Sequence, residues 1–280
     1  MDVKLTCRRD SDKQHADAPD FSDEMRPRMM ATLPMKYANQ PYSLRQYSPR
    51  RHDQGPTGTC VANSGTRGLE IKRMILHSAG GVPDFSKHVP LSRLALYYGA
   101  RELMDPPEVD RDEGTHISLA AEAIRLYGIP AEEPRPGRPV EEAWPWSDAL
   151  SDLCTPPSWM AMRAAYVHKI SKWAKIKSTG TQRVSDVIAN LAAMNPVQIG
   201  FDVGDSWFAY QPGEILQEEK SVKGGHAVLI VGWDPSRTAF LIENSWGSGW
   251  GDDGFCLVDA EVVAGLTAYD LVAYSGGWLS

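Results

Sequence analysis

Four side chains with complementary chemistry stand out in the sequence: Gln54, Cys60, His226 and Asn244. A thiol attacks a carbonyl group only as its thiolate, and the positive end of a helix together with a nearby imidazolium lowers the thiol pKa. Cys60 opens a stretch without proline that is typical of a helix, and His226 opens an apolar stretch that is typical of a strand. The pair therefore favours nucleophilic catalysis by a thiolate, with His226 as the base.

The other two residues supply supporting roles. The amide of Asn244 can hold the second ring nitrogen of His226 and fix its tautomer. Gln54 precedes Cys60 by six residues and could donate its side-chain N–H, beside the backbone N–H of Cys60, to the oxyanion of a tetrahedral intermediate. Taken singly, Gln54 is typical of a surface amide, His226 of a core histidine and Asn244 of a turn. Their order within glycine-rich frames favours the catalytic interpretation.

The hydrophobic pattern predicts the elements that position these residues. It predicts helices over residues 60–77, 91–104, 117–127 and 184–194, and strands over residues 197–203, 227–233, 240–243 and 255–258. A proline-rich crossover over residues 132–157 joins the helical half to the half with strands. Two unlike halves predict an α+β architecture, with a cleft between a helical lobe and a sheet or barrel lobe.

Charge and hydropathy exclude several classes of protein. The 280 residues include 29 basic and 36 acidic side chains, and a formal net charge of -7 disfavours nucleic acid as a partner. No window has the 18 or so consecutive apolar residues that a membrane span needs, so we expect no membrane insertion. Four lysines, at positions 169, 172, 175 and 177, suggest a basic stripe on a solvated face.

The cysteines and the first residues bear on the compartment. Cys7, Cys60, Cys154 and Cys256 show neither metal-ligand spacing nor a disulfide framework, so we expect no metal site and three free thiols beside Cys60. Residues 1–20 are polar and charged, unlike a Sec signal peptide. The sequence therefore predicts cytoplasmic synthesis, and export by a route without a signal stays open.

These residues together resemble the papain family of cysteine peptidases, in its compact bacterial form. Residues 244–251 match the family's Asn-Ser-Trp-Gly-x-Gly-Trp-Gly block at every fixed position, and the spacing from Gln54 to Cys60 is also that of the family. The sequence departs from the family at Thr57, where a cysteine is usual, and at Val61, where a tryptophan is common. The disulfide that usually involves the first of these positions cannot form.

The resemblance implies a papain-like two-lobe fold and a cysteine endopeptidase. It implies that Cys60 and His226 rest as a pair of thiolate and imidazolium, and that the reaction passes through a thioester acyl-enzyme. It implies a peptidase domain over residues 33–280, with a helical lobe over about 44–158 and a β-barrel-like lobe over about 159–280 plus 33–43. The substrate would be a protein or peptide, and no cofactor or metal is implied. The resemblance also places four residues at the substrate: Gly114, Ile199 and Ala227 around a pocket for an apolar side chain, and Trp246 beside the hydrogen bond from His226 to Asn244.

Two other classes of function stay open. One is a related thiol acyl-transfer enzyme, such as a deamidase or a transglutaminase-like protein, which more often orients its histidine with an aspartate than with an asparagine. The other is a non-catalytic binding module on the same fold. Loss of Gln54, Cys60 or His226 would indicate such a module, and the sequence retains all three.

Residues 1–32 form an extension of mostly charged and small residues with no apolar period. A peptidase made in a reducing compartment endangers its own cell, so we expect the extension to inhibit the enzyme. The apolar and proline-containing stretch over residues 21–30 would lie in the substrate groove. The alternative is a tail without a regulatory role.

Overall fold

The computed structural model describes residues 3–11, 13–14, 18–24 and 38–278. The helices are α2 (Phe21–Glu24), α4 (Cys60–His77), α5 (Arg93–Glu102), α6 (Ile117–Leu126), α7 (Leu150–Leu153), α8 (Trp159–Ala165), α9 (Gly180–Ala192), α10 (Asp205–Phe208) and α11 (Ala260–Ala264). The strands are β1 (Cys7–Arg8), β2 (Tyr42–Ser43), β3 (Thr115–His116), β4 (Ile170–Lys175), β5 (Val197–Gly204), β6 (Ile215–Leu216), β7 (Val222–Asp234), β8 (Ala239–Glu243), β9 (Phe255–Asp259) and β10 (Ala268–Trp278).

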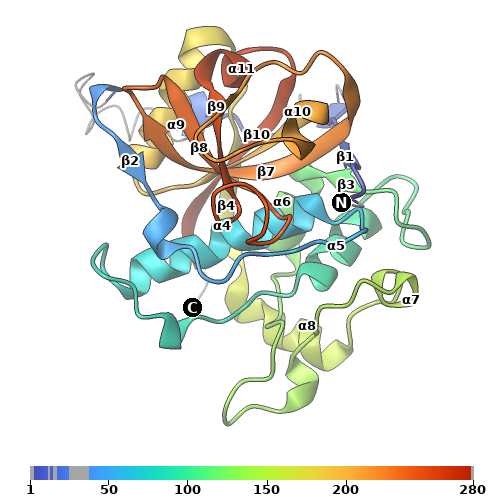
Figure 1. Cartoon of the computed structure of the whole chain (residues 1–280). Helices are drawn as coiled ribbons and strands as arrows, with labels where there is room; N and C mark the ends of the chain where they lie inside the picture. Colours follow the sequence, from blue (N-terminus) through green and yellow to red (C-terminus); the bar gives the residue numbers. More distant parts are fainter. Residues whose placement is uncertain (1–2, 12, 15–17, 25–37, 279–280) are drawn as a thin grey trace.

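A twisted sheet and a group of helices form two layers that meet along α4 (Figure 1). The strands follow one another in the order β4-β10-β5-β7-β8-β9-β6, and β2 pairs with the free edge of β7. Helices α5 and α6 pack on α4 from the opposite side. The α+β two-lobe architecture expected from the sequence is confirmed.

Helix α4 lies close to the sheet because it carries glycine where the two layers meet. A Cβ atom at Gly65 would lie 3.3 Å from the Tyr274 hydroxyl on β10, and one at Gly68 would lie 3.3 Å from the Leu229 side chain on β7. A larger residue at either position would have to displace these neighbours. The two glycines therefore set the approach of α4, and with it the position of Cys60 at the start of the helix.

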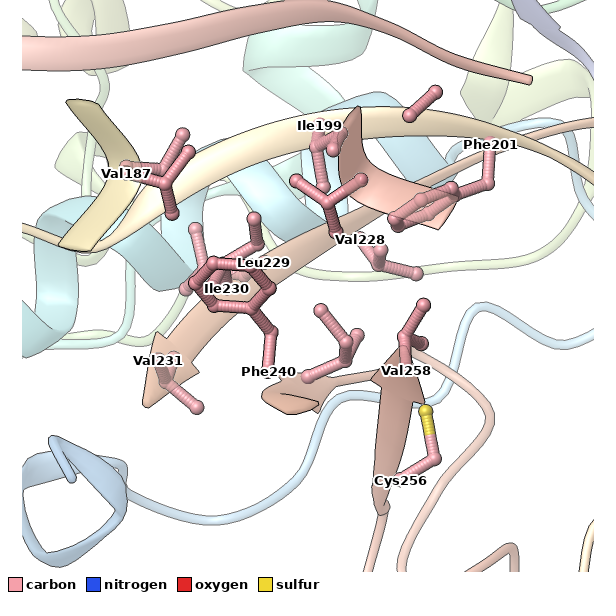
Figure 2. Packing of buried hydrophobic residues seen from close by; sticks show 14 of the residues in the cluster. Val187, Ile199, Phe201, Val228, Leu229, Ile230, Val231, Phe240, Cys256 and Val258 are labelled. Atoms are coloured by element: carbon pink, nitrogen blue, oxygen red, sulfur yellow. The ribbon is translucent and has the colours of Figure 1, made fainter. Parts of the chain in front are cut away.

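Each lobe has its own apolar core. Aliphatic and aromatic residues of β5, β7, β8 and β9 fill the interior of the β lobe, as Figure 2 shows for Ile199, Phe201, Val228 and Phe240. The alternation of side chains along β5 sends Ile199 and Phe201 into this core and Gln198 to the opposite face, where its amide donates to the carbonyl of Val61 at 2.8 Å. One face of β5 thus builds the core and the other contacts α4.

Most of the expected elements are present, with changes at their ends. The helix expected over residues 184–194 begins four residues earlier, at Gly180, and β7 begins at Val222 rather than near residue 227. Strands β1, β4 and β10 were not expected. The expected domain start at Leu33 lies outside the described residues. Within the described part of the chain, no helix is long and apolar enough to cross a membrane.

Candidate active site

Cys60 is the first residue of α4 and is completely buried. Its sulfur accepts hydrogen bonds from backbone amides that include those of Ala227, within β7, and Thr6, in the N-terminal segment. Burial raises the pKa of the Cys60 thiol to about 11, and the backbone hydrogen bonds, which favour the thiolate, only partly oppose this. The arrangement thus holds Cys60 as a neutral thiol.

His226 directly precedes Ala227, whose amide donates to this sulfur, and its ring is held by Asn244. Its Nε2 lies 2.7 Å from Asn244 Oδ1, so the ring donates from Nε2 and keeps its lone pair on Nδ1. Nδ1 is buried and has no hydrogen-bond partner among the described residues. The ring of Trp246 covers His226 at a centroid distance of 4.9 Å and is itself 4% exposed, so it keeps water away from the hydrogen bond to Asn244. The site therefore presents one free, basic nitrogen.

Burial of the site disfavours the ion pair of Cys60 thiolate and His226 imidazolium that the resemblance implies. Burial lowers the pKa of His226 to about 4, and the hydrogen bond to Asn244 opposes this only in part. With the thiol pKa raised and the imidazole pKa lowered, both groups are neutral near pH 7. Removal of water explains the difference, because a buried site disfavours both charged forms.

Gln54 is buried and its side chain is fully engaged. Its Oε1 accepts a hydrogen bond from Ser245 Oγ at 2.7 Å, which orients the amide, and its Nε2 donates to the carbonyl of Thr57 at 2.8 Å. The same Nε2 lies 3.3 Å from the carbonyl oxygen of Lys4. A peptide carbonyl thus already lies against the nitrogen that the sequence suggests as an oxyanion donor.

Residues of the N-terminal segment lie along the front of the site. A Cβ atom on Gly114, whose φ is +80°, would lie 1.8 Å from the Thr6 carbonyl oxygen. Equivalent atoms on Gly224 and Gly225 would lie 2.7 Å from the Leu5 side chain and 2.2 Å from the Cys7 carbonyl. These glycines line the two sides of a cleft, and strand β1 pairs in parallel with β3 inside it. The backbone of residues 5–8 therefore fills the cleft.

A buried ion pair anchors this segment to the sheet. The Asp10 carboxylate, whose side chain is fully buried, lies 2.7 Å from Lys175 Nζ, which also contacts Asp270 at 2.6 Å. The hydroxyl of Ser118 donates to the same Asp10 side chain at 2.6 Å. Lys175 is thus a buried anchor for the segment and does not belong to a solvated stripe.

The stretch expected in the groove lies elsewhere or outside the described residues. Phe21 is 1% exposed and belongs to the apolar core of the β lobe, where α2 packs near β4. Residues 25–30 are not described. The expectation that residues 21–30 occupy the groove is wrong for Phe21, because residues 5–8 fill the cleft beside Cys60.

Three of the expected substrate residues lie at the cleft and one does not. Gly114 contacts Thr6, and the Ala227 amide contacts the Cys60 sulfur, while Trp246 covers His226. Ile199 is buried in the core of the β lobe, on the face of β5 that points away from α4 (Figure 2). Its neighbour Gly200, paired with Ala227, is the β5 residue at the pocket side, because strand residues alternate between faces.

Tyr269 on β10 lies against Gly200 and Cys7 and was not expected from the sequence. Its hydroxyl lies 3.4 Å from the Cys7 carbonyl, and a Cβ on Gly200 would lie 2.3 Å from its ring. The side chain of Cys7, 7% exposed, fills the space between Tyr269 and the cleft. Tyr269 is an aromatic residue in a strand that the sequence pattern did not predict, so nothing in the sequence indicated its position. All four cysteines are free, as expected.

Behind the site, a set of buried charges joins α4 to the end of β8. The Arg67 guanidinium lies 2.8 Å from Glu70 and 2.9 Å from Glu243, all at most 3% exposed. Burial would raise the pKa of Glu70, but Arg67 and then His52 outweigh it and lower the pKa to about 2. Because Glu243 directly precedes Asn244, this network fixes the residue that orients His226.

A hollow of about 960 Å³ lies on the outer side of β1 rather than over Cys60. Side chains of both positive and negative charge line it, and two of its arginines form ion pairs. Arg8 lies 2.8 Å from Glu108, and Arg125 pairs with Glu122. Nowhere in the described residues do three or more His, Cys, Asp or Glu side chains gather as a metal site would require.

Comparisons with known proteins agree with this arrangement. The profile of the family described as papain family cysteine protease matches residues 120–271, which include His226 and Asn244 but not Cys60 or Gln54. A peptidase C1-like protein of Acanthamoeba polyphaga mimivirus is 30% identical over 221 residues, 76% of this chain and 65% of its own length. A gut-specific cysteine proteinase of Caenorhabditis elegans is 29% identical over 128 residues, 40% of this chain and 38% of its own. The chain thus spans less than two thirds of these relatives.

Solved structures extend the likeness of fold to nearly the whole chain. Xylellain, a cysteine protease from Xylella fastidiosa, has a TM-score of 0.74 at 23% identity and covers 99% of this chain and 97% of its own. A cysteine protease of Carica candamarcensis in complex with E-64 has a TM-score of 0.56 at 20% identity, covering 85% of this chain and 99% of its own.

Proposed function

The chain belongs to the papain family of cysteine proteases, and from this premise we propose that it is a cysteine endopeptidase that cleaves peptide bonds through a thioester acyl-enzyme. One observation carries the proposal. The amide next to His226, that of Ala227, donates to the Cys60 sulfur, while Asn244 occupies Nε2 of His226 and leaves Nδ1 without a partner. A nucleophile, a base and an orienting amide thus meet at one point.

The proposed reaction uses these groups in turn. His226 Nδ1 takes the proton of Cys60, and the thiolate attacks a peptide carbonyl carbon. Gln54 Nε2 and the Cys60 backbone N–H stabilise the oxyanion, and the hydrogen bond from Gln54 to the Lys4 carbonyl supports this role. His226 then gives the proton to the leaving amine. Water, deprotonated by His226, finally attacks the thioester and regenerates the thiol.

The proposal includes restraint of the enzyme by its own N-terminal segment. Thr6 presents an amide N–H, rather than a carbonyl carbon, to the Cys60 sulfur, so the sulfur has nothing to attack there. Side chains and carbonyls of residues 5–7 lie against Gly114, Gly224 and Gly225, where a substrate backbone would have to lie. The segment also keeps water out, and the neutral pair of Cys60 and His226 depends on that exclusion.

Turnover and covalent labelling together test the proposed activity. With the N-terminal segment displaced by Thr6→Trp, we expect the enzyme to cleave a peptide library and produce new amino termini. A thiol-directed epoxide should label Cys60 in a one-to-one ratio and abolish this cleavage. Cys154→Ala is the matched control, because Cys154 is half-buried and lies in the loop after α7. Release of ammonia from glutamine without new amino termini would favour the deamidase alternative. Binding of peptides with no turnover in any variant would favour a binding module.

A second experiment tests the restraint in the full chain. Thr6→Trp places a large side chain where Thr6 Oγ1 lies 2.5 Å from the position of a Cβ on Gly58, so the segment cannot stay seated. We expect faster cleavage of a small peptide, and inhibition of this variant by a synthetic peptide of residues 3–10. Ser11→Trp, at an exposed position of the same segment, is the control. An unchanged rate in Thr6→Trp, with no effect of the peptide, would refute the restraint.

A further inference from the structure

The side chain of Lys4 makes a specific contact inside the cleft. Its ammonium group donates to the backbone carbonyl and to the carboxylate of Asp112, with 3.2 Å between Nζ and Oδ2. The Asp112 side chain is 9% exposed, whereas that of Lys4 is 43% exposed. The carboxylate is therefore a nearly buried acceptor that faces the cleft and is approached from solvent.

Asp112 is held rigidly beside the nucleophile. The backbone N–H of Gly58, two residues before Cys60, donates to both of its carboxylate oxygens at 3.0 Å. The hydroxyl of Tyr97 donates to Oδ1 at 2.6 Å and accepts a hydrogen bond from Gly114 at 3.0 Å. These neutral donors fix the position of the carboxylate without cancelling its charge. A cation is the partner that it lacks when Lys4 is absent.

The backbone of Lys4 shows which substrate residue would reach this carboxylate. The carbonyl oxygen of Lys4 lies 3.3 Å from Gln54 Nε2, the nitrogen assigned above to the oxyanion. A residue whose carbonyl lies at Gln54 therefore has its side chain within reach of Asp112. In a substrate, the carbonyl that binds there belongs to the residue on the N-terminal side of the scissile bond.

We propose that Asp112 is a specificity-determining residue that selects a lysine or arginine side chain on the N-terminal side of the scissile bond. The inference rests on the proposed peptidase function and adds the substrate class. The nearby cation of Arg111 does not compete with the substrate for Asp112. Arg111, on the neighbouring exposed loop, lies 3.4 Å from Asp110 and 3.9 Å from Glu113, so its charge is already engaged.

The test compares two peptides that differ in one group. They are identical except that one has lysine and the other norleucine, which lacks only the ammonium, before the scissile bond. Both compete in one reaction with the full chain carrying Thr6→Trp, and the ratio of kcat/KM does not depend on the fraction of enzyme that is active. We expect the lysine peptide to be preferred about tenfold or more, as suits a charge-assisted hydrogen bond to a nearly buried carboxylate.

Two further variants assign the preference to Asp112. Asp112→Asn keeps an oxygen for the Gly58 and Tyr97 donors but loses the charge, and we expect the ratio to fall towards one. Asp110→Asn removes an equal charge two residues away, at a side chain that is 78% exposed, and we expect the ratio to stay as in the parent. Thermal unfolding checks that both variants fold.

The outcomes separate this inference from the proposed function. Absence of hydrolysis of both peptides would contradict the peptidase function itself. Hydrolysis of the norleucine peptide as fast as the lysine peptide would overturn the inference while leaving the function standing, and this comparison needs no Asp112 variant to fold. A preference for lysine that persists in Asp112→Asn would also overturn it, because the ammonium would then bind elsewhere.

Discussion

The two ends of one stretch of α4 use burial in opposite ways. At its first residue, Cys60 is buried with only backbone amides as polar partners of its sulfur, and the neighbouring His226 keeps an unpartnered Nδ1. About two turns later, Arg67 is just as buried but contacts both Glu70 and Glu243. Burial alone therefore does not decide what a polar group does. Buried charges that lie against opposite charges stabilise the fold, whereas a buried nitrogen such as His226 Nδ1, with neither a hydrogen bond nor an ion pair, is available for chemistry.

The largest expected effect is on catalysis, at Cys60 and His226. Cys60→Ala or His226→Ala should lower kcat for peptide hydrolysis by about 10⁴-fold or more, because each removes a member of one cooperative unit. Thermal unfolding should stay close to that of the parent. Measurements use the Thr6→Trp background, with Cys154→Ala as the control. Near-parental turnover in either variant would show that Cys60 and His226 are buried for packing alone.

At the ion pairs of Arg67, in the middle of α4, the effect should fall on stability. Arg67→Met leaves Glu70 and Glu243 buried without their shared partner, and we expect the free energy of unfolding to drop by about 3–5 kcal/mol. Lys87→Ala removes an exposed pair, 3.7 Å from Asp84, and should change it by less than about 1 kcal/mol. Denaturant unfolding measures both. Equal effects would mean that the buried network has no special role.

Gln54 belongs to both kinds of region, since its Oε1 accepts from Ser245 and its Nε2 lies 3.3 Å from the Lys4 carbonyl, where we propose that the reacting carbonyl binds. Gln54→Ala should therefore lower kcat by about 10²–10³-fold, as the loss of one oxyanion donor does. Ser245→Ala keeps the donor and removes only its anchor, so the loss should be smaller. Steady-state kinetics distinguish the two. If both variants lose activity equally, Gln54 acts through the position of its loop.

The smallest effect separates the two regions by pH. His226 has a folded pKa of about 4 against an ordinary 6.5, so its contribution to stability is present above pH 6.5 and is lost as the pH falls towards 4. The loss in the free energy of unfolding amounts to about 2 kcal/mol at pH 5. Glu70, with a pKa lowered from 4.5 to about 2, loses its contribution only below pH 4.5. His52 and His168 shift in the same direction as His226 and add to the upper window.

His226→Asn isolates the first of these contributions. The difference in unfolding free energy between pH 7 and pH 5 should shrink by about 2 kcal/mol in this variant, whereas the decline below pH 4.5 should persist. Chemical denaturation at pH 7, at pH 5 and at a pH below 4.5 measures both windows. An unchanged difference between pH 7 and pH 5 would mean that His226 is hydrated, and that the neutral pair described above does not form.

Local pattern predicted most of the helices and the core strands, because their apolar periods are strong and they begin or end at glycine or proline. The residues at the front of the site were harder to predict. Lys175 lies in a run of lysines that is typical of a solvated face, yet it is buried between Asp10 and Asp270. These partners are 165 and 95 residues away, and no local pattern encodes such a pairing.

The same limit explains Ile199 and the N-terminal segment. Ile199 and Gly200 are neighbours in sequence but lie on opposite faces of β5, so a shift of one residue moves a side chain from the pocket to the core. For the segment, the apolar content of residues 21–30 suggested the groove. In the structure, close contacts with glycines decide instead, and these hold residues 5–8 in place.

The position of β10 determines when the active site can assemble during synthesis of the chain. This strand comes last in the chain among the strands of the sheet, yet it lies between β4 and β5, and Tyr269 on it lies against Gly200 and Cys7. During synthesis on the ribosome, Lys4 to Cys60 emerge first, but the sheet that carries His226 gains its inner strand only after residues 268–278 have emerged. A partly made chain therefore holds the Cys60 thiol without its finished cleft. When β10 completes the sheet, the N-terminal segment that covers the site is already present.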